Sequence, residues 1–312
     1  MSPVLVTGAD GFIGSTLLDA LSSIGRPARA LCGPPAAAAV PGRDVAAERV
    51  ARADLAAQPV PHDLIDGAAA VVHLAGPASV ARSFERPVDY VGAHVTGTAR
   101  VVADAVAAGV PRLVLVSSAE VYGRPTANPV PEPAATAPRS PYGAAKVGAE
   151  AVATAAARRG DLDVVVVRPF SGIGPGMAPW SVLGTLLARA AAGEPLAVAD
   201  PGPVRDLVHV EDVAAALLAA VEAPLRSGVT VCNACTGVGT SVGDLMALVA
   251  DVTGTGVAAA PAPADRPAAA DLPELVGDPT AAARELGWRA RIGVREGVEA
   301  MWAGTRPAMT AG

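Results

Sequence analysis

Lysine is almost absent from this sequence of 312 residues, and aromatic residues make up only 3% of it. One of the 24 basic residues is a lysine, Lys146, and the others are arginines. A single lysine in a chain whose other basic residues are all arginines indicates a position where arginine cannot replace it, because a guanidinium group does not deprotonate and is bulkier. Lys146 is therefore a candidate functional residue, although a chance survivor on a solvated face would give the same count.

Cysteine and histidine are also scarce, which bears on disulfides and metals. The three cysteines are too few, and odd in number, for a disulfide framework. Cys232 and Cys235 have no second pair to complete a zinc site, so we interpret them as small residues at a strand end. The four histidines lack the spacings typical of metal ligands, and we predict no metal site. They are His62, His73, His94 and His209.

Long apolar runs and clusters of basic residues are missing as well. No stretch of about 18 apolar residues occurs, which excludes a membrane-spanning helix. The net charge of −6, without a basic cluster, argues against nucleic acid or an anionic membrane as partner. A hydrophobic content of 51% excludes a disordered chain. The first residues enter a strand pattern without a basic leader, so we expect a soluble, cytoplasmic protein.

Short apolar strands alternate with amphipathic helices through the first half of the chain, which predicts an α/β fold with a doubly wound parallel sheet. We place a dinucleotide-binding Rossmann domain at 1–168, with a strand near 229–232 returning to it. Residues 169–312 are predicted to form mainly a smaller, substrate-binding C-terminal lobe. Strands are expected at 4–7, 28–32, 70–74, 113–117 and 164–167. Helices are expected at 15–24, 87–108, 141–158, 180–192, 211–222, 241–253, 278–286 and 293–301.

A glycine-rich turn links the first strand to the first helix. Gly8, Gly11 and Gly14 have the spacing G-x-x-G-x-x-G. Glycines there let the chain turn tightly and let a pyrophosphate approach the helix N-terminus. Close packing of helix on strand would also require small residues, but the position between strand and helix favours a dinucleotide site.

Tyr142 and Lys146 lie four residues apart on a predicted helix and so share one face. An ammonium group there favours the phenolate and is expected to lower the pKa of the tyrosine from about 10 toward neutrality. Ser118 follows the preceding strand and can hydrogen-bond the same substrate oxygen. Together the three residues predict an acid/base group for a carbinol or carbonyl oxygen.

Eight ordered motifs resemble the extended short-chain dehydrogenases/reductases, the NAD-dependent epimerase/dehydratase family that acts mostly on nucleotide sugars. Among them are VLVTGADGFIG (4–14), SPYGAAK (140–146) and VRDLVHVEDVA (204–214). The resemblance implies Ser118, Tyr142 and Lys146 as the catalytic set. It implies that a nicotinamide dinucleotide contacts Gly8, Asp10, Gly11, Phe12, Ile13, Gly14, Asp54, Leu55, Leu74, Ala75, Gly76, Ser117, Tyr142, Lys146 and Pro169. The substrate is expected to contact Ser79, Glu120, Ser171, Arg205 and Arg266, with the two arginines as a diphosphate clamp.

Three departures from the family pattern affect these expectations. The acidic residue that ends the second strand in NAD-using members is replaced by Cys32-Gly33, so we expect a slight preference for NADP(H), with Arg29 and Arg43 as possible clamps of the 2′-phosphate. His94 replaces a common asparagine, and we interpret it as a variant tie to the backbone. Ser171 replaces an asparagine that would help to hold the substrate diphosphate.

Further residues and motifs distinguish among the reactions of that family. The pair Ala119-Glu120 replaces the Asp-Glu of sugar-nucleotide 4,6-dehydratases, so a 4,6-dehydratase is disfavoured. The similarity is greatest to reductases of nucleotide-diphospho-4-keto-6-deoxyhexoses, with Tyr142 as the general acid. A nucleotide-sugar epimerase is the alternative, and a catalytically silent dinucleotide-binding regulator is a second one. We expect a homodimer.

Overall fold

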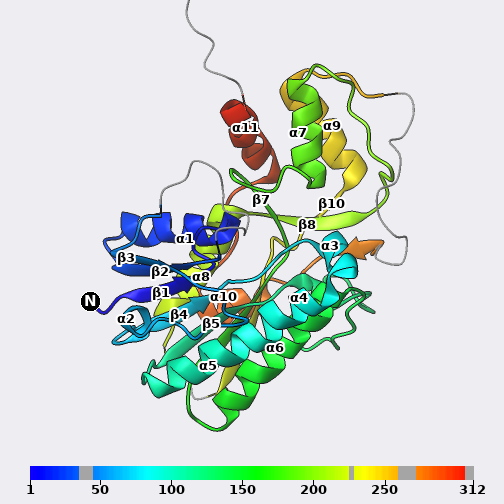
Figure 1. Ribbon diagram of the computed structural model, residues 1–312. Coiled ribbons are helices and arrows are strands. Elements are labelled where there is room, and N and C mark those ends of the chain that lie inside the picture. Colours follow the sequence, from blue (N-terminus) through cyan, green and yellow to red (C-terminus); the bar gives the residue numbers. More distant parts are fainter. Residues whose placement is uncertain (35–44, 225–227, 259–271, 306–312) are drawn as a thin grey trace, which may run out of the picture.

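The computed structural model of the protein describes residues 1–34, 45–224, 228–258 and 272–305. These residues form a large and a small sheet, with helices packed against each (Figure 1). Within these ranges, none of the helices has the length and apolar character to cross a membrane.

The large sheet has seven parallel strands in the order β3-β2-β1-β4-β5-β6-β9. Strands β1, β4 and β5 are buried along their whole length, as continuous apolar runs in a doubly covered sheet must be. The strand order reverses between β1 and β4, the kind of place where open α/β sheets bind ligands. The predicted Rossmann-type fold is confirmed. The strand bounds are β1 Val4–Thr7, β2 Ala28–Cys32, β3 Arg49–Arg52, β4 Ala70–His73, β5 Arg112–Val116, β6 Asp163–Pro169 and β9 Val229–Ala234.

Helices cover both faces of this sheet (Figure 1). On one face α1 (Phe12–Ser23) and α8 (Val210–Glu222) share a hydrophobic cluster, and on the other α5 (Gly97–Ala107) and α6 (Pro141–Arg158) share a second. The helix predicted at 87–108 consists of α4 (Pro87–Val91), the π-helical turn η1 (Gly92–Thr96) and α5 in direct succession. The short elements are α2 His62–Ile65, α3 Val80–Glu85, η2 Ala119–Val121 and α10 Thr280–Leu286.

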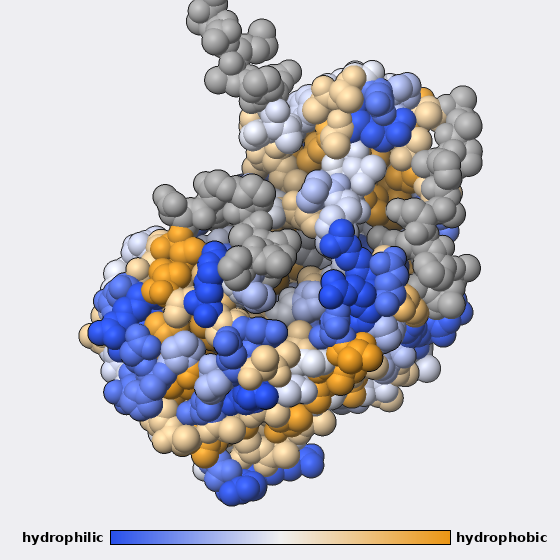
Figure 2. All heavy atoms as spheres, in the orientation of Figure 1, coloured by the Kyte–Doolittle hydropathy of each residue, from blue (hydrophilic) through white to orange (hydrophobic). Residues whose placement is uncertain are grey.

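A smaller lobe lies at the top of the molecule in Figure 1. Its central strand β8 (Val204–His209) pairs with β7 (Ser171–Ile173), β10 (Gly239–Ser241) and β11 (Glu274–Leu275). Helices α7 (Val182–Ala191), α9 (Val242–Thr253) and α11 (Val294–Thr305) bury their apolar faces in one cluster of this lobe. Figure 2 shows the surface indented where this lobe meets the main body.

The edge strand β3 was not expected from the sequence. Its residues, Arg-Val-Ala-Arg, carry no apolar run, and three of the four are exposed. Pairing with β2 in parallel register gives the strand its place, with Cys32 opposite Arg52. Hydropathy cannot detect an edge strand of this kind, because water rather than a helix covers it.

Candidate active site

The glycine-rich turn has the shape that a dinucleotide site requires. Gly8 has φ +68, and a Cβ at Gly14 would lie 2.2 Å from the Gly8 oxygen, so both positions need glycine for the turn itself. Gly11 begins α1 in an extended conformation, without a side-chain cap and without an acidic residue in the first turn. That helix N-terminus is a favourable site for an anion such as pyrophosphate. The turn therefore fits a nicotinamide dinucleotide.

Gly11→Val is expected to abolish dinucleotide binding while the protein still folds. A Cβ at Gly11 would contact only the Gly8 oxygen, at 3.2 Å, and the glycine has ordinary negative φ, so the fold tolerates a side chain there better than at Gly8 or Gly14. The branched side chain would fill the space of the pyrophosphate. Calorimetric titration measures the affinity, and circular dichroism measures folding. Gly256→Ala is the control, since its Cβ would meet nothing within 4 Å; unchanged affinity in Gly11→Val would contradict the assignment.

The residues predicted to contact the adenine side lie after β3 and β4. The Asp54 carboxylate accepts a hydrogen bond from the Ala56 amide at 3.0 Å, and Leu55 is buried. Leu74, Ala75 and Gly76 follow β4 directly and pass beside Gly8, the first glycine of the turn. The structure thus brings these segments to the same edge of the sheet as the glycine turn.

The three predicted catalytic residues come together at the carboxyl end of β5. Ser140 caps α6 by accepting a hydrogen bond from the Gly143 amide at 3.1 Å, which places Tyr142 in the first turn of the helix. The Lys146 Nζ atom lies 5.9 Å from the centre of the Tyr142 ring and donates to the Val116 carbonyl at 2.8 Å. The Ser118 side chain lies beside the Tyr142 hydroxyl, where it favours the ionised form of the tyrosine. The structure thus brings the three residues together, and their acid/base role stays a prediction.

The expected lowering of the tyrosine pKa is wrong. Burial raises the pKa of Tyr142 to about 12, and the Ser118 side chain offsets this only in part. The nearby Glu120 carboxylate also raises the pKa. Burial lowers the pKa of Lys146 to about 8, while the Glu150 carboxylate opposes that shift. Spacing on a helix did not reveal these effects, because they depend on how deeply both groups are buried.

Two rings that the sequence analysis did not assign to catalysis pack against Tyr142. The His94 ring lies 5.5 Å from the Tyr142 ring, and the Tyr90 ring lies 6.2 Å from it at 89°. His94 donates from Nε2 to the Pro77 carbonyl at 2.9 Å, so its predicted role as a tie to the backbone is confirmed. Burial lowers the pKa of His94 well below its usual value, which keeps the ring neutral beside the tyrosine.

A buried ion pair lies beneath the catalytic residues and was missed by the sequence analysis. Glu150 accepts hydrogen bonds from Arg168 at 2.9 and 2.7 Å and from the Ser117 hydroxyl. Arg168 in turn donates to the Tyr122 hydroxyl at 2.8 Å. Ser117 was predicted to contact the cofactor, and its hydroxyl is directed to Glu150. The spacing of 142, 146 and 150 on one helix face was the available signal.

The residues predicted to bind substrate lie in different parts of the structure. Ser79 caps α3 and accepts from the Arg82 amide at 3.3 Å, whereas Glu120 is half-buried beside Tyr142. Ser171 lies on β7, and Arg205 on β8 donates to the Val204 and Leu272 carbonyls at 2.9 and 2.7 Å. Pro169 ends β6 and is buried. Arg266 lies outside the described residues.

Comparison with known proteins identifies the family. The NAD dependent epimerase/dehydratase family matches residues 4–234, and the chain belongs to it. It is thus an enzyme of the extended short-chain dehydrogenase/reductase type whose members act on nucleotide sugars. The UDP-glucose 4-epimerase of Azospirillum brasilense is 31% identical over 306 residues, which cover 91% of this chain and 86% of the relative.

Solved structures agree with that assignment over the whole fold. MoeE5 in complex with UDP-glucuronic acid and NAD is 34% identical, with a TM-score of 0.87, and the match covers 97% of this chain and 99% of MoeE5. The UDP-glucose 4-epimerase of Thermus thermophilus in complex with NAD is 28% identical, with a TM-score of 0.86 and coverage of 98% and 99%.

The slight preference for NADP(H) expected from the sequence is wrong, because these similar structures contain NAD. The expected clamps do not support a 2′-phosphate either. Arg29 donates to the carbonyls of Leu64 and Asp66, at 3.0 and 2.6 Å, and Arg43 lies outside the described residues. The lack of an acidic residue at the end of β2 therefore does not by itself indicate NADP(H), because residues from other elements also surround that end.

Proposed function

We propose that this protein is an NAD-dependent epimerase that inverts C4 of a UDP-hexose. The convergence of Ser118, Tyr142 and Lys146 beside a dinucleotide turn supports the proposal most directly. The relatives named UDP-glucose 4-epimerase and the UDP-sugars bound to similar structures supply the substrate class and the carbon. NAD is the proposed cofactor on the same grounds.

The chain's own residues provide the proton transfer. The turn from Gly8 to Gly14 would hold NAD, which would supply reversible hydride transfer at the sugar carbon. Tyr142 must first lose its own proton; as the phenolate it then takes the proton of the sugar hydroxyl and gives it back when the ketone is reduced, while Ser118 hydrogen-bonds the reacting oxygen. At neutral pH Lys146, with a pKa of about 8, is mostly an ammonium and stabilises negative charge on the Tyr142 oxygen.

A reductase of nucleotide 4-ketosugars is the second candidate, supported by the motif RPFSGIGPG (168–176). Incubation with UDP-glucose, UDP-glucuronic acid and a 4-ketosugar, each with NAD or NADH, separates the candidates. An epimerase forms the C4 epimer, detected by NMR, without net change in reduced nicotinamide. A reductase consumes one NADH for each ketosugar. Binding of dinucleotide without any turnover would instead favour the silent regulator.

The domain organisation and the oligomeric state are also proposed. We propose residues 1–168 as the dinucleotide-binding domain and 169–312 as mainly the substrate lobe, with β9 in the large sheet.

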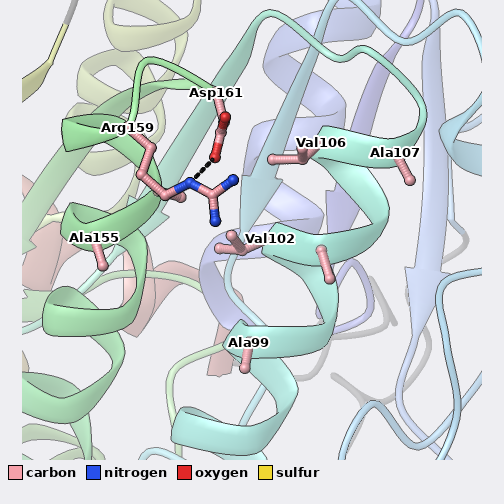
Figure 3. A pocket seen from close by; sticks show the side chains of 9 residues that line it. Ala99, Val102, Val106, Ala107, Ala155, Arg159 and Asp161 are labelled. Carbon is pink, nitrogen blue, oxygen red and sulfur yellow. Dashed lines mark ion pairs between the residues drawn. The ribbon is translucent and has the colours of Figure 1, made fainter.

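A groove between α5 and α6 is lined by small exposed residues such as Ala99 and Ala155 and bordered by the Arg159–Asp161 ion pair at 3.0 Å (Figure 3). Exposed apolar helix faces of this kind support the expected homodimer, which sedimentation velocity tests. The cytoplasmic location stays a prediction.

A further inference from the structure

Charged side chains from other elements lie at the carboxyl end of β2. In Rossmann-type folds an acidic side chain about 20 residues after the glycine turn binds the ribose hydroxyls of the adenosine. This chain has Cys32 and Gly33 at that position. The ribose would therefore lack its usual carboxylate partner if only β2 supplied one.

Asp10 brings a carboxylate to that same place from the glycine turn. Its Oδ1 atom lies 3.4 Å from the Gly33 amide nitrogen, which donates to it. The Asp10 side chain is only 12% exposed, so its direction is fixed by packing. The pKa of the Cys32 thiol is raised by burial and further by the charge of Asp10, which agrees with this close approach.

Arg52 holds the carboxylate in position from the neighbouring strand. Its Nη1 atom lies 2.9 Å from Asp10 Oδ2 and 2.9 Å from the Gly33 carbonyl oxygen. The register of β2 and β3 sets Arg52 opposite Cys32, so the arginine emerges at the same end of the sheet. Its side chain is 45% exposed, which leaves part of the guanidinium open to solvent.

We propose that Asp10, positioned by Arg52, is the residue that selects NAD over NADP in this chain. The inference rests on the proposed function, because it assumes a dinucleotide in the Rossmann site. A carboxylate accepts hydrogen bonds from a ribose diol but repels a 2′-phosphate. Arg52 would attract that phosphate, but its charge is compensated by Asp10. The pair together therefore disfavours NADP although an arginine stands at the site.

The two members of the pair should act in opposite directions. Asp10→Asn keeps the shape, removes the repulsion and frees Arg52 for a phosphate, so the ratio of the Kd for NADP to the Kd for NAD should fall at least about tenfold. Arg52→Ala leaves the carboxylate uncompensated, so the same ratio should rise. Isothermal titration calorimetry on the full chain measures both constants. A purely structural ion pair would lower both affinities together and leave their ratio unchanged.

A matched ion pair at the other end of β3 provides the control. Arg49 and Asp63 lie 3.4 Å apart, and Asp63→Asn should leave the ratio unchanged. If the wild type binds NAD and neither Asp10→Asn nor Arg52→Ala changes the ratio, the inference is overturned and the dinucleotide site stands. If the wild type binds neither dinucleotide, the proposed function is overturned as well.

Discussion

Tyr142→Phe should lower kcat for inversion of the UDP-hexose by about 10²–10⁴-fold, the usual contribution of a positioned acid or base. The substitution keeps the ring that packs against Tyr90 and His94 and removes only the hydroxyl that Ser118 contacts. The affinity for NAD should change by less than about tenfold, because the pyrophosphate site is separate. NMR of the product and calorimetry with NAD measure the two quantities.

Tyr90→Phe is the matched control for that variant. The Tyr90 ring lies 6.2 Å from the Tyr142 ring, and its hydroxyl donates to the Ser79 carbonyl at 2.6 Å. Loss of that hydroxyl removes a structural hydrogen bond from the same aromatic cluster, which typically costs about 1 kcal/mol of stability. We expect kcat to fall by less than about tenfold. Equal losses in the two variants would show that Tyr142 acts through packing rather than proton transfer.

Glu150→Gln should reduce both stability and the pH range of activity. Breaking a buried ion pair leaves Arg168 uncompensated and typically costs about 3–5 kcal/mol. Because the Glu150 carboxylate opposes the lowering of the Lys146 pKa, its neutralisation should take that pKa below its value of about 8. Lys146 would then lose its ammonium at lower pH. The decline of kcat on the alkaline side should therefore move to lower pH, measured by rate profiles between pH 6 and 10, a range chosen around that pKa.

Asp163→Asn separates the electrostatic effect from the loss of stability. The Arg112–Asp163 pair is as well buried as Glu150–Arg168 and has the same separation, 2.7 Å, but Asp163 begins β6 while Arg168 lies near its carboxyl end. Urea unfolding should show a comparable loss of stability in both variants. Only Glu150→Gln should shift the pH profile. A shift of the same size in Asp163→Asn would mean that the profile reports stability and not the charge of Lys146.

The parts of the fold that the sequence predicted were those with strong local signals. Continuous apolar runs marked β1 and β5, and the Gly8–Gly14 spacing marked the turn into α1. Strand β3 carried no such signal, because its side chains are mostly exposed and its place depends on pairing with β2. The short strands of the smaller lobe also depend on partners distant in sequence.

The parts of the candidate site that lie on a single helix or a single turn were predicted from the sequence. Tyr142 and Lys146 are separated by one helical turn, so their proximity follows from spacing alone. The Glu150–Arg168 pair and the contact of Asp10 with Arg52 join different elements, so spacing within one helix could place Glu150 near Lys146 but could not indicate the partner of either carboxylate. The expected preference for NADP(H) rested on the residues of β2 alone. The Asp10 carboxylate, which comes from the glycine turn, also lies at the end of that strand.

The retention of deuterium at the inverted carbon tests the account most directly. UDP-glucose that carries deuterium at C4 would be incubated with the protein and NAD in ordinary water, and the epimer analysed by NMR. Hydride transfer returns the same atom to the same carbon, so the account predicts that the epimer keeps its deuterium. An epimer in which solvent hydrogen replaces the deuterium would contradict it, since that outcome requires removal of the atom as a proton.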